Sequence, residues 1–239
     1  MKIFVISDIH GSLSSFRAAM DAFDREKADH LLICGDYLNH GPRNDIPAGY
    51  DTKGLAKALN DMKHLITGVR GNCDSEVDQM MLEFPVLAPY TTILVPGSAG
   101  DSRDVRARTR AELLESGADR SGTSGVRAQT SGVRRIFVHH GHLMTAEEAG
   151  RLNTAGTVIV SGHTHVPVLE RYEPVQAARE NAEQTAADRA AGYILLNPGS
   201  VSIPKGGSEP GYAIIEVAAH CMKIRLCTLS GKVLKELVC

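Results

Sequence analysis

The stretch KIFVISDIHG, residues 2–11, decides the fold, because an apolar run ends there abruptly at polar side chains. The apolar part has the β-branched and aromatic composition of a strand that is buried on both faces. Asp8 and His10 follow at its carboxyl end, and Ser12 is a suitable N-cap for a helix whose apolar residues recur at helical spacing. The stretch therefore predicts a strand, a polar turn and a helix in succession.

Four more buried strands that end at polar turns follow along the chain. They are residues 30–34 before Gly35-Asp36, residues 65–69 before Gly71-Asn72-Cys73-Asp74, residues 135–138 before His139-His140-Gly141-His142, and residues 157–160 before Ser161-Gly162-His163-Thr164-His165. A helix capped by Thr52 is predicted between the second strand and the third. Strands that alternate with helices favour a parallel sheet, which carries functional residues at the carboxyl ends of its strands.

The C-terminal part of the chain has a different pattern. Three predicted strands, residues 211–217, 221–229 and 232–237, follow one another without an intervening helix. This order predicts antiparallel hairpins. The C-terminal half should therefore be more antiparallel than the N-terminal half.

Two segments contain few large apolar residues, about 96–134 and about 173–190. Such segments cannot bury enough surface to offset the entropy of ordering them, so we predict insertions in loops. A short helix is expected within the first, at residues 105–114. The chain of 239 residues is otherwise long enough for one α/β domain, predicted over residues 1–239.

The amino-acid composition limits which binding partners and which cellular compartment we expect for this protein. The formal net charge is −2 with 23% charged residues, which argues against nucleic acid or an anionic membrane as a partner. No apolar run reaches the length of a membrane span, and the N-terminal run is too short for a signal peptide. Five cysteines without a CxxC pair argue against a disulfide framework or a zinc ribbon. We therefore expect a cytoplasmic protein that acts on a small molecule, and the sequence leaves a homo-oligomer open.

Seven side chains at the predicted strand ends are of types that bind metal ions: Asp8, His10, Asp36, Asn72, His140, His163 and His165. Two carboxylates, one amide oxygen and four imidazoles exceed what one ion needs and suit two adjacent divalent ions, with one carboxylate as a bridge. A set without thiolate argues against structural zinc and fits Mn²⁺, Fe²⁺, Ni²⁺, Co²⁺ or catalytic Zn²⁺. Each residue alone also has an ordinary explanation, because Asp and Asn often occupy turns and histidines are common on surfaces.

The chain resembles the calcineurin-like metallophosphoesterases through five short motifs that occur in the order of that family. The motifs are Asp8-Ile9-His10, Gly35-Asp36, Gly71-Asn72-Cys73-Asp74, His140-Gly141-His142 and Gly162-His163-Thr164-His165. More narrowly, the chain resembles the small bacterial phosphodiesterases of the YfcE type, because residues 69–75 and 197–207 match as well. The likeness extends over nearly the whole chain outside the two insertions.

This resemblance implies a fold, a site and a reaction. The fold is a four-layer α/β/β/α sandwich of two mixed β-sheets flanked by helices. The ligands would divide into Asp8, His10 and His165 for one ion, Asn72, His140 and His163 for the other, and Asp36 as the bridge. The first candidate for both ions is Mn²⁺. A hydroxide that bridges them would attack the phosphorus of a small phosphodiester.

The candidate catalytic residues are Asp36, Asn72, His40 and Cys73, and two of them depart from the family. Many relatives carry a histidine after the asparagine, where it can protonate the leaving group, whereas this chain has Cys73. A thiol with an ordinary pKa near ~8.5 is a weak acid catalyst at neutral pH, so esters with good leaving groups should react best. The protein-phosphatase branch carries a phosphate-binding arginine at the position of His40. This argues against protein phosphatase activity and makes His40 a candidate substrate contact or substitute acid.

Several alternatives stay open from the sequence. The same site could serve a phosphomonoesterase or a nucleotide pyrophosphatase, or the fold could be a non-catalytic scaffold like the retromer subunit that resembles it. A zinc peptidase is disfavoured because the chain contains no HExxH motif. His142 could orient a ligand or the phosphate, whereas His139 is expected to be packed. Arg70 and Lys205 could bind phosphate or form structural ion pairs.

Overall fold

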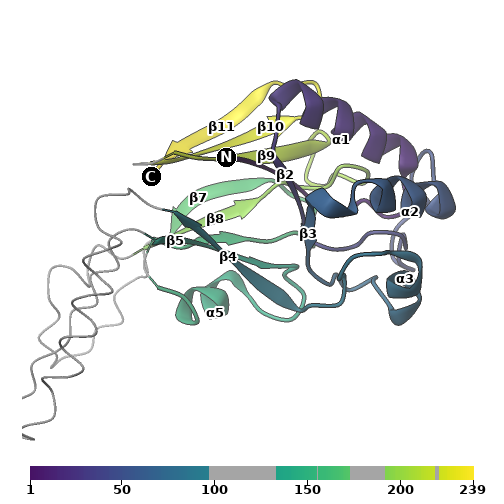
Figure 1. Ribbon diagram of the computed structural model, residues 1–239, viewed down its shortest axis with the longest axis horizontal. Helices are drawn as coiled ribbons and strands as arrows, with labels where there is room; N and C mark the ends of the chain where they lie inside the picture. The colour runs from purple at the N-terminus through teal and green to yellow at the C-terminus, as the bar shows by residue number, and fades with distance from the viewer. Residues whose placement is uncertain (97–132, 155, 173–191, 219–220) are drawn as a thin grey trace, which may run out of the picture.

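The computed structural model describes residues 1–96, 133–154, 156–172, 192–218 and 221–239 of the chain. Within these ranges the strands form two sheets, one of six strands and one of five, which lie face to face (Figure 1). Apolar residues from both sheets form the core between them. Helices cover the outer faces, so the described part of the chain has four layers.

The first sheet has the strand order β11-β10-β9-β1-β2-β3. Its strands are β1 (Lys2–Ile6), β2 (His30–Ile33), β3 (Ile66–Gly68), β9 (Gly211–Val217), β10 (Met222–Thr228) and β11 (Val233–Val238). The strands β1, β2 and β3 run parallel, whereas β9 pairs with β1 and with β10, and β10 pairs with β11, in antiparallel orientation. The predicted parallel N-terminal strands and antiparallel C-terminal hairpins are both confirmed, and they meet in one sheet.

The second sheet has the strand order β4-β5-β6-β8-β7. Its strands are β4 (Tyr90–Pro96), β5 (Val133–His139), β6 (Val158–Val160), β7 (Val168–Tyr172) and β8 (Tyr193–Asn197). The strands β5, β6 and β8 run parallel, and the edge strands β4 and β7 are antiparallel to their neighbours. Both sheets are therefore mixed.

The strands β4 and β5 pair along their whole length, from Tyr90 opposite His139 to Pro96 opposite Val133. The predicted limits of the first insertion, 96 and 134, therefore fall inside these strands. The connection between these strands, which the sequence predicts to be an insertion, begins and ends at the end of the pair that is away from His139. The rest of this insertion, with the helix predicted at 105–114, lies outside the described residues, as does the second at 173–190.

The alternating side chains of β1 show how the layers are built. Ile3 and Val5 pack in the core between the sheets, and Phe4 and Ile6 pack under the helices on the opposite face. All four are almost fully buried, because a central strand that is covered on both sides has no face in water. The unbroken apolar run of the sequence reflects this double burial.

Helices α1 (Leu13–Glu26) and α2 (Thr52–Asp61) cover the outer face of the first sheet (Figure 1). Each turns one apolar side to the sheet, where Phe16 and Leu59 are almost fully buried. None of the described helices combines the length and the apolar character that crossing a bilayer requires.

The short helix α5 (Ala146–Arg151) covers part of the outer face of the second sheet. There Ala149 packs in a cluster with Phe137, Ile159 and Tyr193. With α1 and α2 on the other side, the order of layers is helices, sheet, sheet, helix. The predicted α/β/β/α sandwich is confirmed.

Two predicted boundaries are wrong. Asp51, and not Thr52, is the N-cap of α2, because its carboxylate accepts a hydrogen bond from Gly54 N at 2.9 Å. The third strand is shorter than residues 65–69, because residues 63–65 form a 3₁₀ turn before it. Helices α3 (Glu76–Met81) and α5 were not predicted, since six residues are too few to show helical periodicity.

Glu26 ties the C-terminal end of α1 to the first sheet. Its carboxylate pairs with Arg225 of β10 at 2.7 Å and accepts a hydrogen bond from the Tyr212 hydroxyl of β9 at 2.9 Å. The Glu26 and Arg225 side chains are only 13% and 17% exposed. Burial alone would raise the pKa of Glu26, but the hydrogen bonds from Arg225 and Tyr212 lower it.

We expect Glu26→Gln to lower the free energy of unfolding by about 1–3 kcal/mol at pH 7, because Arg225 keeps its charge and loses one of its two carboxylate partners, with Glu216 remaining at 3.2 Å. Since the folded-state pKa is lowered, this stabilisation is present above pH 4.5, the ordinary pKa of Glu, and disappears as the pH falls through the folded-state value. Urea unfolding of both proteins between pH 7 and the acid range measures the difference. A difference that stayed constant through that range would contradict the role assigned to Glu26.

Candidate metal centre

The structure brings all seven predicted ligands together at the carboxyl ends of β1, β2, β3, β5 and β6. Three of these strands belong to the first sheet and two to the second, so the centre lies where the two sheets meet. Each side chain comes from the loop that directly follows its strand. This is the edge at which parallel sheets usually place functional residues.

The backbone of these loops is bent into a conformation that side chains rarely adopt. Among the described residues, six other than glycine have a positive φ, and one of them, Lys27, ends α1. The other five have φ between 49° and 67° and are all predicted ligands: Asp8, His10, Asp36, His163 and His165. Each such residue costs about 1–2 kcal/mol, which the surrounding contacts must offset. Backbone strain of this kind is typical of functional sites.

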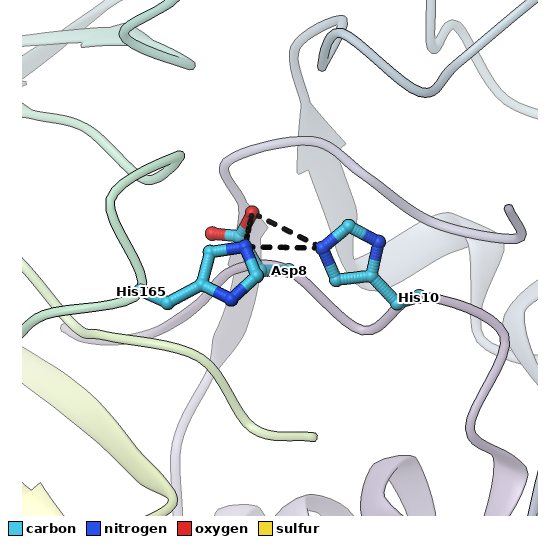
Figure 2. Close-up of side chains that lie close together, drawn as sticks. All are labelled: Asp8, His10 and His165. Atoms are coloured by element: carbon cyan, nitrogen blue, oxygen red, sulfur yellow. Dashed lines mark hydrogen bonds and ion pairs between the residues drawn. The ribbon is translucent and has the colours of Figure 1, made fainter. Parts of the chain in front are cut away.

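Figure 2 shows the first half of the centre, in which Asp8, His10 and His165 lie close together. The two Nε2 atoms are 3.2 Å apart, and His165 Nε2 lies 3.2 Å from Asp8 Oδ1. All three residues are buried, with 3% exposure or less. Asp8 Oδ1 is nevertheless without a hydrogen bond from the described residues. A buried carboxylate oxygen in this state needs another partner.

The other ring nitrogens determine which atoms face this group. His10 Nδ1 lies 2.9 Å from the carbonyl oxygen of Asn39, and His165 Nδ1 lies 2.6 Å from that of Ile203. A carbonyl oxygen only accepts, so each Nδ1 carries a proton and donates it. In the neutral rings both Nε2 atoms then present lone pairs to each other and to Asp8. A cation can satisfy all three, and hydrogen bonds from the far ring nitrogen are the usual support of a metal-binding histidine.

Asn72, His140 and His163 form the second half. Asn72 Oδ1 lies 3.1 Å from His140 Nε2 and 2.7 Å from His163 Nδ1. His140 Nδ1 is held by the carbonyl oxygen of Cys34 at 2.6 Å, which turns Nε2 toward the centre. Asn72 is exposed and His163 is half-buried, whereas the first half is buried. Substrate can therefore approach from the second half.

Asp36 lies between the two halves. Its Oδ2 is 3.6 Å from His10 Nε2 and 3.4 Å from His140 Nε2, one histidine from each half. Its Oδ1 accepts a hydrogen bond from Cys73 N at 2.8 Å, which fixes the orientation of the carboxylate. A carboxylate in this position can serve both halves at once.

The two buried carboxylates attract positive charge. Burial alone would raise the pKa of Asp8, but the imidazoles of His10 and His165 lower it well below its ordinary range. The pKa of Asp36 is lowered in the same way, against the effect of burial, by His140. Although burial opposes a charge on His140, Asp36 and Asp8 raise the pKa of this histidine to about 9. Divalent ions would supply positive charge here in place of protons on the imidazoles.

The donor set fits divalent metal ions. It combines carboxylate, imidazole and amide atoms, as ions such as Mn²⁺, Fe²⁺ and catalytic Zn²⁺ accept. Among the described residues, three groups have all ligand atoms within 4.8 Å of one another: Asp8, His10 and His165; His10, Asp36 and Cys73; and Asp8, Asp36 and His140. Asp8, His10 and Asp36 each belong to two of them. Cys73 was not predicted as a ligand, and burial together with the charge of Asp36 raises the pKa of its thiol to about 12.

The structure places the catalytic candidates Cys73 and His40 differently. Cys73 lies inside the centre, with its Sγ 3.1 Å from Asn72 Nδ2. The His40 ring instead contacts Tyr50, with Nδ1 3.4 Å from the Tyr50 hydroxyl. No hydrogen bond or ion pair within the described ranges joins the His40 side chain to the seven ligands. A catalytic role for either residue stays a prediction.

Asp74 holds two loops of the centre together, a role for which its place in a motif was the only sign in the sequence. Its carboxylate accepts hydrogen bonds from the backbone N–H groups of Asp36, Tyr37 and Gly71, at 2.9, 2.8 and 2.6 Å. Burial and the charge of Asp36 raise the pKa of Asp74 to about 7. Its contacts join the loop after β2 to the loop after β3.

The segment after β8 supports the loops that follow β1 and β6. The hydroxyls of Ser200 and Ser202 both donate to the carbonyl oxygen of Asp8, at 2.7 and 2.9 Å. Asn197 Nδ2 donates to the carbonyl oxygen of Gly162 at 2.7 Å. The motif that begins at Asn197 therefore positions the backbone of the loop after β1 and of the loop after β6, which both carry ligands.

Glycine is required at two places where these loops approach each other. A Cβ atom at Gly71 would lie 2.1 Å from Asp36 Oδ1, and one at Gly162 would lie 1.9 Å from Ser7 Oγ. Neither neighbour is a flexible side-chain end that can move away, because each belongs to a buried residue. The glycines of these motifs therefore permit the ligands to meet.

A cavity of about 330 Å³ opens over the centre. It is lined by Asp36, Arg43, Asn44, Asn72, His163, Thr164, His165 and Lys205. Arg43 and Lys205 are exposed, and neither forms an ion pair with a carboxylate of the described chain. Cations beside a metal centre suit an anionic ligand. Of the two roles predicted for Lys205, the geometry therefore favours contact with a ligand over a structural ion pair.

Comparisons with known proteins agree with this site. The sequence profile described as the calcineurin-like phosphoesterase superfamily domain matches residues 1–220. The chain is 37% identical over 216 residues to the phosphodiesterase YfcE of Escherichia coli strain K12, which covers 90% of this chain and 88% of YfcE. The chain belongs to the calcineurin-like phosphoesterases. It is accordingly a hydrolase of phosphate esters, and membership of the family implies divalent metal ions at this centre.

A solved structure of YfcE and one further relative support the assignment. A solved structure of YfcE from E. coli, described as a phosphoesterase, matches with a TM-score of 0.66 at 31% identity, covering 99% of this chain and 98% of that one. The probable metallophosphoesterase YsnB of Bacillus subtilis is 26% identical over 178 residues, which are 69% of this chain and 76% of YsnB. The predicted resemblance to the YfcE type is confirmed.

We expect Asp74→Asn to weaken metal binding ~10-fold or more, because the amide turns an N–H group toward one of the three backbone donors. The free energy of unfolding should fall by about 1–3 kcal/mol. Titration with Mn²⁺ and urea unfolding measure the two effects. Asp51→Asn is the matched control, since Asn caps a helix as well as Asp does. Unchanged Mn²⁺ affinity in Asp74→Asn would show that the loops do not depend on this carboxylate.

Proposed function

We propose that this phosphoesterase hydrolyses small phosphodiesters at a centre that holds two divalent ions, with Mn²⁺ as the first candidate. The observation that carries the proposal is the place of Asp36 Oδ2, 3.6 Å from His10 Nε2 and 3.4 Å from His140 Nε2, between two groups of ligands. The likeness to YfcE, a phosphodiesterase, supports the same class of substrate.

The seven ligands divide between the ions in this proposal. Asp8, His10 and His165 would hold the first ion, Asn72, His140 and His163 would hold the second, and Asp36 would serve both. When bound, the ions neutralise charge on the phosphoryl oxygens and make a water molecule nucleophilic at neutral pH. The chain keeps the imidazoles in place by hydrogen bonds to the carbonyl oxygens of Cys34, Asn39 and Ile203.

Arg43 and Lys205 are proposed to bind the phosphate oxygens that the ions do not contact. Both line the cavity beside His163, and no described carboxylate neutralises them. They would take the place of the arginine that the protein-phosphatase branch carries at the position of His40. Esters with good leaving groups should react fastest, because Cys73 stands where many relatives have a histidine.

A phosphomonoesterase or nucleotide pyrophosphatase would use the same residues. The observation that favours this alternative is the pair of cations, Arg43 and Lys205, since they would attract the dianion of a monoester more strongly than the monoanion of a diester. Values of kcat/KM for an aryl diester, an aryl monoester and a nucleotide panel separate the alternatives. The cytoplasmic location, a small-molecule substrate as sole partner and the oligomeric state stay predictions.

Mn²⁺-loaded protein should hydrolyse bis(p-nitrophenyl) phosphate, and Asp36→Ala should lose at least ~10³-fold in kcat, because Asp36 Oδ2 lies within 3.6 Å of one histidine from each set of ligands. Release of p-nitrophenolate measures the rate. Asp45→Ala is the control, since Asp45 is an exposed carboxylate of the same loop. Lack of activity in the wild type, or full activity in Asp36→Ala, would refute the proposal.

Replacing His163 or His165 by Ala should remove a different ion in each case. Mn²⁺ bound per chain should fall from two toward one in either variant, as measured by metal analysis after gel filtration. Combination with Asn72→Ala distinguishes the sites, because His163 shares its ion with Asn72 and His165 does not. The pair His163→Ala and Asn72→Ala should keep one ion, whereas His165→Ala and Asn72→Ala should lose both. Equal metal content in the two double variants would contradict the division.

A further inference from the structure

A second recess, of about 400 Å³, adjoins the metal centre on the side of Asn72. Its walls include Arg70, Leu87, Pro89, His142 and Leu143. Asn72 also lines the cavity that contains Arg43 and Lys205, so the two spaces meet at one candidate metal ligand. A ligand bound at Asn72 can therefore extend into both spaces.

The recess differs in chemistry from the cavity beside it. Leu87, Pro89 and Leu143 give it apolar walls, whereas the other cavity is lined by charged, amide, imidazole and hydroxyl side chains. Leu143 is 62% exposed although it stands next to a site built from polar groups. A large apolar side chain in this place gains contacts when an apolar ligand covers it.

Two polar side chains border these apolar walls. Arg70 Nε donates to the carbonyl oxygen of Asp74 at 3.2 Å, and its guanidinium lies 3.7 Å from the exposed carboxylate of Glu76. A guanidinium anchored in this way presents a plane on which an aromatic ring can stack. His142 Nδ1 is buried without a hydrogen bond to the described residues, and its ring lies 5.3 Å from the His140 ring.

We propose that this recess binds a planar aromatic substituent of the phosphate ester, an aryl ring or a nucleobase. The inference rests on the proposed function for the position of the phosphate. The phosphate lies at Asn72, with its charged oxygens toward Arg43 and Lys205. The substituent then points away from these cations and between Leu143 and Arg70. The recess thereby selects esters with an aromatic group over those with a small alkyl group.

The test compares phenylphosphonate with methylphosphonate, two non-hydrolysable ligands that carry the same phosphonate group and differ in the ring. Their affinities for the full-length, Mn²⁺-loaded protein are measured by calorimetry. We expect the wild type to bind phenylphosphonate about tenfold more tightly, which is typical of a small apolar pocket. Leu143→Ser should lose most of this preference and keep its affinity for methylphosphonate.

Leu94→Ser is the matched control, because Leu94 is 60% exposed and belongs to β4, outside the recess. This variant should keep the full preference for the phenyl ligand. Arg70→Lys keeps the charge without the guanidinium plane and should reduce the preference. Equal affinities for the two ligands in the wild type would overturn the proposal, and so would an equal loss for both ligands in Leu143→Ser.

Hydrolysis of the aryl diester by the same preparations separates this inference from the proposed function. A preference for the phenyl ligand without diester hydrolysis would contradict the proposed function and support the recess. Hydrolysis without the preference would support the function and overturn the assignment of the recess.

Discussion

Two carboxylates, Asp8 and Asp36, are buried where the two sheets meet, and they must be neutralised there. Ionised groups at this depth are stable only when they have partners of opposite charge and saturated hydrogen bonds. The loops after β1, β3, β5 and β6 supply these partners, so contacts to two carboxylates join the two sheets. Divalent ions neutralise these carboxylates more fully than protons on the imidazoles do. The same ions supply the positive charge that phosphate-ester hydrolysis uses.

This arrangement requires the backbone to bend at each strand end. Five ligands adopt a left-handed conformation, and their loops are kept in it by groups that contact only backbone atoms. Asp74 binds the N–H groups of two loops, and Ser200 and Ser202 bind the Asp8 carbonyl oxygen. The surrounding chain thus holds the ligand side chains in position before ions bind, so binding needs little further ordering of these loops.

Burial and ligand chemistry explain how much could be predicted from the sequence. Strands covered on both faces leave apolar runs, and metals accept few side-chain types, so the sandwich and the seven clustered side chains were predictable. Asp74 and Ser200 were not, because a side chain that binds backbone amides or carbonyls follows no spacing rule. The cavity around Arg43 and the recess around Leu143 could not be predicted either, because each is lined by loops that lie far apart in the sequence. Asp51 and Thr52 are adjacent and both can cap a helix. Only the hydrogen bond from Gly54 N to the Asp51 carboxylate shows which of them is the N-cap of α2.

The paired strands β4 and β5 separate the metal centre from the site of the first predicted insertion. His139 pairs with Tyr90 beside the ligand His140, and the connection between the strands leaves from Pro96 and Val133 at the opposite end. Seven consecutive residue pairs fix the register of β4 against β5. Residues added between Pro96 and Val133 therefore do not shift β5, which leads directly to His140. The connection between β4 and β5 is therefore a suitable place to attach a reporter domain or an affinity tag while the catalytic loops keep their positions.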